Sequence, residues 1–208
     1  NRIIARSWTT NAQWAQAFSR LPLLDRLTEV ERTRLRRLAI LFLHKKSFSG
    51  AHGLVVTEEM ALVIALQACL LILNLGIEWY DGWLEIIVYP GGFAPRRSVT
   101  DAAGVVHQVD DALSGEAWQR GPVVLSWDAT ANAGALDGDN LVIHEFAHKL
   151  DMLTGAANGF PPIHADMDAA EWNHTFSAAF EDFRANAEAG IETGINTYGA
   201  SSPAEFIA

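Results

Sequence analysis

Apolar residues recur at helical spacing in two segments near the start of the chain, Thr10–Ser19 and Thr28–Lys45. The second segment begins with Thr28, a residue type that caps helices through its side-chain oxygen, and Glu31 lies three residues after it, as in a capping box. The pattern predicts two helices, followed by a glycine-containing loop over Phe48–Leu54.

The next segment is apolar on all sides rather than along one face. It begins at Thr57, a capping residue, and we expect Gly76 to end it. The run is short for a membrane span, and the polar Gln67 and Asn74 lie within it. The sequence therefore predicts a central buried helix with Cys69 as a buried thiol, and no membrane partner.

Short β-rich runs follow, and helical spacing then returns. Three strands are predicted, at Leu84–Tyr89, Val105–Val109 and Pro122–Trp127. Three helices are predicted after them, at Leu141–Leu153, at Ala169–Glu188 and from Pro203 onwards. This order gives an α+β fold that is mostly helical. We expect one domain over residues 1–208, with a helical part (1–80) and a part that holds the sheet and the later helices (81–208).

Composition and charge narrow the class of protein. Half of the residues are apolar, as in a globular protein, and the single cysteine fits a reducing compartment. The net charge of −10 argues against nucleic acid as the main partner. The charge is unevenly spread, because residues 1–46 carry ten basic and three acidic side chains. This basic segment is either a partner surface or a solvated helix face.

The strongest chemical pattern is H-E-x-x-H, formed by His144, Glu145 and His148 within a predicted helix. Residues four apart project from the same side of a helix, so the two imidazoles can bind one metal ion. Zinc accepts two imidazoles and a carboxylate and leaves a fourth position for water. Glu145 can then act as general base towards this water and as acid towards the departing amine. The motif predicts a zinc-dependent peptidase.

Two histidines need a third protein ligand. Asp151 lies about 10 Å along the helix axis from His144, so we expect it either to orient His148 or to be an ordinary polar residue. Glu205 is favoured because Pro203, at the first helical position, places it in the first turn. Spacing alone leaves a helix-capping role for Glu205 equally open. The other candidate ligands are His164, Glu171, His174, Glu181, Asp182, Glu188 and Glu192.

Two segments, His144–Met152 and Tyr198–Phe206, together resemble the Mlc titration factor A family of zinc peptidases. Softer similarities extend the resemblance over nearly the whole chain, at Pro22–Leu24, Gln67–Leu71 and Val88–Pro90. The resemblance implies that both histidines and Glu205 ligate one zinc ion. It also implies that Tyr198 lies at the active site, as a candidate donor to the developing oxyanion.

The resemblance further implies a zincin-like fold, related to the anthrax lethal factor catalytic domain, with a small sheet beside the H-E-x-x-H helix. It implies aminopeptidase-type activity on a peptide substrate, a cytoplasmic location and binding of a glucose-regulatory repressor protein. The family pattern continues past Glu205, so we expect the natural chain to extend beyond residue 208. We also expect weak zinc binding in a chain that ends three residues after this ligand.

Two further functions compete with the peptidase. The first is a non-catalytic module that binds a repressor and keeps a structural or vestigial zinc site. Glu145 favours catalysis, since a structural site needs no base, whereas the basic segment favours the module. The second is a metal-dependent hydrolase of non-peptide amides. The predicted strand Pro122–Trp127 either pairs with an extended substrate or has a purely structural role.

Overall fold

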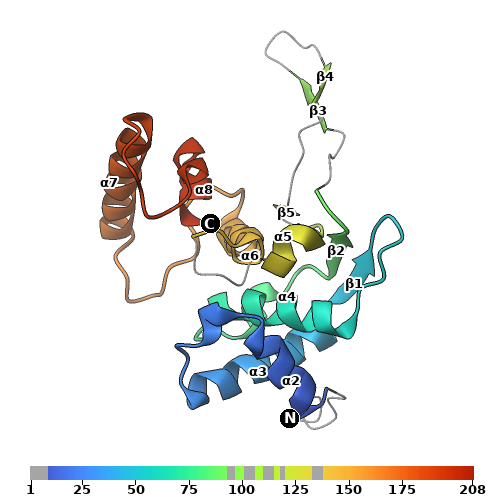
Figure 1. Cartoon of the computed structure of the whole chain (residues 1–208). Coiled ribbons are helices and arrows are strands. Elements are labelled where there is room, and N and C mark those ends of the chain that lie inside the picture. The colour runs from blue at the N-terminus through green and yellow to red at the C-terminus, as the bar shows by residue number, and fades with distance from the viewer. Residues whose placement is uncertain (1–8, 93–96, 101–105, 110–114, 118–119, 133–137) are drawn as a thin grey trace.

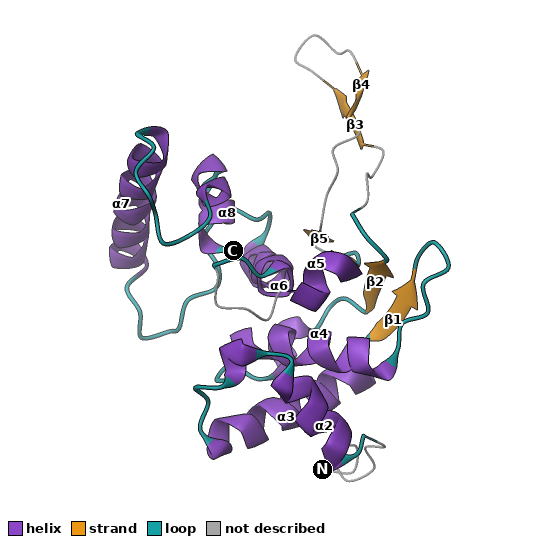
Figure 2. Cartoon of the chain, in the orientation of Figure 1, coloured by secondary structure: helices purple, strands orange, loops and turns teal. Residues whose placement is uncertain are grey.

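Helices make up most of the residues that the structure describes, and a small sheet lies beside them (Figures 1 and 2). This computed structural model describes residues 9–92, 97–100, 106–109, 115–117, 120–132 and 138–208. The fold is α+β and mostly helical, as the sequence predicts.

Three helices form the N-terminal part of the core. α2 (Asn11–Ser19) and α3 (Glu29–Lys45) both pack against α4 (Glu58–Leu71), as Figure 1 shows. The hydroxyl of Thr28 accepts a hydrogen bond from the backbone of Glu31, and the Glu31 carboxylate accepts one in return from the backbone of Thr28. These bonds satisfy N–H groups that the first turn of a helix leaves without partners. The predicted capping box is therefore confirmed.

The buried central helix that the sequence predicts is α4. Every residue from Leu62 to Cys69 is buried within the core. The helix ends at Leu71, before the predicted Gly76, because the backbone tightens into a turn in which the N–H of Leu75 donates to the carbonyl of Ile72. Among the described residues, no helix combines the length and the hydropathy that crossing a membrane requires.

A four-stranded mixed sheet has the strand order β1-β2-β6-β5. β1 (Ser47–Gly50), β2 (Glu85–Tyr89) and β6 (Val123–Ser126) are parallel, and β5 (Gly115–Ala117) runs antiparallel to β6. The prediction of a loop over Phe48–Leu54 is wrong for its first residues, which belong to β1. So short a segment carries no periodic signal of its own, and it becomes a strand because β2 supplies partners for its backbone groups.

The strand predicted at Pro122–Trp127 is β6, which lies in the interior of the sheet. Because β2 and β5 occupy its two edges, it cannot pair with an extended substrate, and all four of its residues are buried. The structural alternative is the correct one. A separate antiparallel pair, β3 (Arg97–Thr100) with β4 (Val106–Val109), contains the described part of the strand predicted at Val105–Val109; Val105 lies outside the described residues.

The remaining helices are α5 (Trp127–Asn132), α6 (Leu141–Asp151), α7 (Ala169–Glu188) and α8 (Pro203–Ile207). Short 3-10 turns occur at Pro22–Leu24, Ile77–Tyr80, Met152–Thr154 and Thr197–Ser201. The sequence predicted α7 with the observed bounds but missed α5, which follows β6 directly. α7 and α8 lie beside each other at the C-terminal end of the chain (Figure 1). Their contact is aromatic, because Phe206 packs on Phe176, Phe180 and Phe183.

An aromatic cluster joins α6 to the N-terminal helices. Phe146 of α6 packs on Phe42, Tyr80 and Trp83, with ring centroids 5.3–5.7 Å apart. Edge-to-face pairs of this kind stabilise a fold beyond the area that they bury. Phe146 and Tyr80 are completely buried, so the cluster fixes α6 against the core.

Removing the hydroxyl of Tyr80 should destabilise this cluster measurably. The hydroxyl donates a 2.8 Å hydrogen bond to the carbonyl of Ala68 inside the core. We expect Tyr80→Phe to lower the free energy of unfolding by about 1–3 kcal/mol, because the carbonyl loses a partner that water cannot replace. Urea unfolding followed by circular dichroism measures the change, and an unchanged midpoint would contradict it.

Candidate metal centre

The helix α6, which carries both histidines, is held in place by contacts at its start and at its middle. The Asn140 side chain caps it by accepting a 2.9 Å hydrogen bond from the backbone of Ile143. The amide of Asn140 also donates to Gln67, a fully buried residue of α4. Phe146 holds the opposite side of the helix in the core. The orientation of the two histidines is therefore set by the packing of the whole helix.

Three side chains converge beside α6. The Nε2 atoms of His144 and His148 are 3.2 Å apart. One carboxylate oxygen of Glu205, Oε2, lies 3.2 Å from the first of these nitrogens and 3.4 Å from the second. Among the described residues, these three form the one group of histidine, cysteine and acidic side chains that could hold a metal ion.

Glu205 reaches the histidines from α8. Pro203 occupies the first helical position, as predicted, and the hydroxyl of Ser202 caps the helix by accepting from the backbone of Glu205. The first turn of α8 therefore places the Glu205 carboxylate beside α6. The seven other candidate ligands stay outside the group, judged on the described part of the chain.

Burial favours the neutral form of His144, which is the form that binds metal. It lowers the pKa of His144, the neighbouring His148 lowers it further, and Glu205 acts in the opposite direction. A neutral imidazole is the species that donates its lone pair to a cation. The Oε2 atom of Glu205 is buried without a hydrogen-bond partner in the described structure. An unpartnered buried oxygen between two imidazole nitrogens suits a cation.

The two candidate catalytic residues lie at different depths. Glu145 follows His144 on α6 and is 4% exposed. Tyr198, in the 3-10 turn before α8, is 59% exposed, and its ring centroid is 6.3 Å from that of His144. The structure thus brings Tyr198 to the rim of the group that the histidines form.

Of the two roles predicted for Asp151, the first, orienting His148, is wrong. Within the described structure, the Nδ1 atom of His148 has no hydrogen-bond partner, so Asp151 does not orient this ring directly. Asp151 instead accepts hydrogen bonds from the backbone of Asn158 and Gly159. The reason is geometric, because the carboxylate at the end of α6 points into the loop that follows the helix.

The sequence also gave no indication of two buried lysines that flank Trp83. Lys149, on α6, donates to the carbonyl of Gly121, and its Nζ lies 4.7 Å from the Trp83 ring centroid. Lys46 donates to the carbonyls of Tyr80 and Trp83, with its Nζ 3.5 Å from the same centroid. Burial lowers the pKa of each lysine to about 8. The pair brings α6 and the end of α3 together around one aromatic ring in the segment before β2.

The stability of the protein should therefore rise with pH above 8. Lys46 begins to lose its proton near pH 8 when folded, whereas an unfolded lysine keeps it up to about pH 10.4. The unfolded state binds more protons in this window, so the free energy of unfolding increases with pH. We expect a smaller slope in Lys46→Met, measured by urea unfolding between pH 7.5 and 10. The control, Arg26→Met at an exposed position, removes a charge that does not act on Lys46 and should keep the wild-type slope.

An H-E-x-x-H helix that meets a carboxylate beside a small sheet defines a metallopeptidase-like protein. A family model described as glucose-regulated metallo-peptidase M90 matches residues 1–208. Proteins named Mlc titration factor A, from Yersinia pestis (strain Pestoides F) and Yersinia pseudotuberculosis serotype O:3 (strain YPIII), are each 40% identical to the chain over 200 residues. Each match covers 95% of this chain and 73% of the relative. The chain belongs to the glucose-regulated metallo-peptidase M90 family, which confirms the resemblance.

Proposed function

We propose that this chain is a single-domain, zinc-dependent peptidase with aminopeptidase-type activity. His144, His148 and Glu205 hold the ion, and Glu145 is the general base and acid. The observation that carries the proposal is the convergence of three donor atoms beside a buried glutamate on the same helix. The family supports a metallopeptidase-like protein, and the catalytic activity is the step that we add.

The spacing of the donor atoms suits zinc. They lie 3.2, 3.2 and 3.4 Å from one another. Ligand atoms around a tetrahedral zinc ion with bonds of about 2.0–2.1 Å are separated by about 3.3–3.4 Å. Two imidazoles and one carboxylate are also the donor set of catalytic zinc sites, which keep a fourth position for water. The residues therefore fit this ion without rearrangement.

Each residue of the proposed site has a separate role in hydrolysis. A zinc ion, when bound here, lowers the pKa of a coordinated water and polarises the scissile carbonyl. Glu145 takes a proton from the attacking water and returns it to the departing amine, so that the C–N bond breaks without releasing an amide anion. Tyr198 donates a hydrogen bond from the rim to the oxygen on which negative charge develops.

Removal of the metal should abolish hydrolysis reversibly. We expect about one zinc per chain by metal analysis of protein supplied with excess zinc, loss of peptide hydrolysis after dialysis against a chelator, and recovery on addition of zinc. Aminopeptidase specificity requires a free N-terminus, so the same peptide with an acetylated N-terminus should be cleaved far more slowly. Hydrolysis that survives complete removal of metal would contradict the mechanism.

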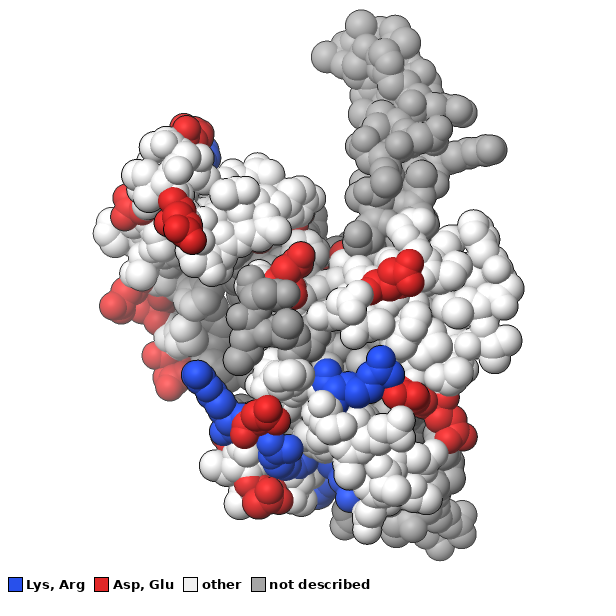
Figure 3. Space-filling view, in the orientation of Figure 1, with Lys and Arg blue, Asp and Glu red and all other residues white. Residues whose placement is uncertain are grey.

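A second candidate function is capture of a repressor by a non-catalytic module in the cytoplasm. The name that the relatives carry, Mlc titration factor A, favours an interaction with such a protein. The basic segment gives it little support, because many of its cations have partners within the chain. Figure 3 shows them interspersed with acidic side chains over the N-terminal helices. The pairs are Arg20 with Glu59, Arg32 with Asp25, Arg34 with Asn74, Arg36 with Asn11 and Lys45 with Asp81.

A further inference from the structure

A buried carboxylate that the mechanism does not use lies close to the metal site in sequence. Asp151 is the last residue of α6 and is completely buried. We propose that Asp151 is a positioning residue, which holds Glu205 within reach of the histidines through the loop at Gly159 and the start of α8. The inference rests on the metal site of the proposed function.

The first link joins α6 to the loop that follows it. The Oδ2 atom of Asp151 accepts hydrogen bonds from the backbone N–H groups of Asn158, at 2.7 Å, and of Gly159, at 2.8 Å. Two bonds to one carboxylate oxygen fix both position and direction, and bonds to a charged acceptor are stronger than neutral ones. The loop is thereby attached to the helix that carries both histidines.

The second link joins this loop to α8. Gly159 has a φ of +80°, and a Cβ built on it would lie 2.6 Å from the carbonyl oxygen of Pro203 and 2.8 Å from its carbonyl carbon. These are backbone atoms, so they cannot swing aside as the end of a side chain can. Pro203 is the first residue of α8 and stands two residues before Glu205.

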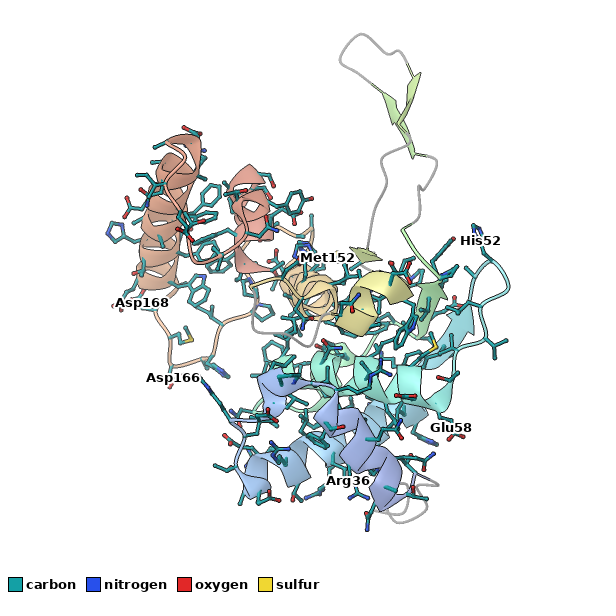
Figure 4. All side chains as sticks on the ribbon, viewed as in Figure 1. Arg36, His52, Glu58, Met152, Asp166 and Asp168 are labelled. Carbon is teal, nitrogen blue, oxygen red and sulfur yellow. The ribbon has the colours of Figure 1, made fainter. Side chains whose placement is uncertain are left out.

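The two links form one continuous path from α6 to the third ligand. In Figure 1 the segment that follows α6 passes beside α8 before it reaches α7, and Met152 marks the end of α6 in Figure 4. α8 is only five residues long, and Phe206 in its last turn packs on α7 rather than on α6. Contacts at its first turn therefore set the place of Glu205 relative to α6, because a displacement of Pro203 moves the carboxylate with it.

A merely structural role for Asp151 makes a different prediction. Loss of a buried, hydrogen-bonded carboxylate would lower the free energy of unfolding but leave the metal affinity of the folded protein unchanged. A positioning role lowers that affinity as well. The zinc dissociation constant of the folded protein, measured by competition with a chelator, separates the two roles without any assay of hydrolysis.

The sharpest test compares two glycines. We expect Gly159→Ala to weaken zinc binding by about 10–100-fold, the range found when groups that orient a ligand are changed. Gly190→Ala is the matched control, because its φ is +68° and nothing lies within 4 Å of the added Cβ. Both variants bear the strain of a left-handed alanine. Only in Gly159→Ala does the added Cβ collide with the backbone of Pro203.

Substitution of the carboxylate itself provides a second test. We expect a loss of the same size in Asp151→Ala and a smaller loss in Asp151→Asn, whose amide oxygen can still accept from the loop. Asp166→Ala is the control, at an exposed position of the same loop that Figure 4 labels. It should bind zinc as the wild type does.

The outcomes separate this inference from the proposed function. The inference is overturned if the wild type binds zinc and Gly159→Ala binds it equally well while folded. A wild type that binds no zinc contradicts the proposed function and the inference together. Should Asp151→Ala fail to fold, the comparison of Gly159→Ala with Gly190→Ala decides the matter.

Discussion

Replacing Glu145 by glutamine should lower kcat for peptide hydrolysis by about 10²–10⁴-fold, the usual contribution of general acid–base catalysis. Glutamine has nearly the same shape, but its amide cannot take a proton from the attacking water. Glu145 is buried on α6 beside a proposed metal ligand and is not itself part of the ligand group. Zinc binding should therefore persist. Steady-state kinetics and metal analysis on the same preparation measure both quantities.

The control for this experiment is Glu188→Gln. Glu188 lies at the end of α7, with its side chain 75% exposed, and its ion pair with Arg184 is long, at 3.9 Å. Surface pairs of this kind contribute little to stability. The control should hydrolyse peptides at the wild-type rate. If Glu145→Gln also keeps that rate with zinc bound, another group transfers the proton and the mechanism is wrong.

Replacing Glu205 by alanine should weaken zinc binding by at least about 100-fold, since groups that only orient a ligand already account for 10–100-fold. The oxygen of Glu205 lies within 3.4 Å of both histidine nitrogens, and no other described carboxylate shares the group. Chelator competition measures the dissociation constant. Zinc at 100 times the wild-type dissociation constant should stabilise the wild type by about 2.7 kcal/mol and the variant far less.

Glu192→Ala is the appropriate comparison for Glu205→Ala. Glu192 was one of the other candidate ligands on sequence grounds, and it lies exposed in the loop that precedes the last turns of the chain. It should bind zinc as the wild type does. Equal affinity in Glu205→Ala and the wild type would show that the third ligand comes from elsewhere, and the ligand set would have to be revised.

Much of the centre could be predicted from local sequence because its parts lie on one helix. His144 and His148 are four residues apart, and helical periodicity alone brings their rings together. The start of α8 could also be predicted, since Pro203 is typical of a first helical position. What spacing left open was whether Glu205 reaches the histidines or only caps its helix. The family resemblance favoured the first role.

Sequence by itself determined the elements whose signals are local: the capped helices, the buried α4 and the histidine pair of α6. Only the tertiary structure decided the role of β1 and the interior place of β6, because both depend on segments distant in the chain. It also decided the partners of Asp151, because these depend on the path of the loop after α6. Helical periodicity acts over a few residues, whereas strand pairing and loop contacts depend on what the rest of the fold brings alongside. The approach of Glu205 to the histidines belongs to this second kind.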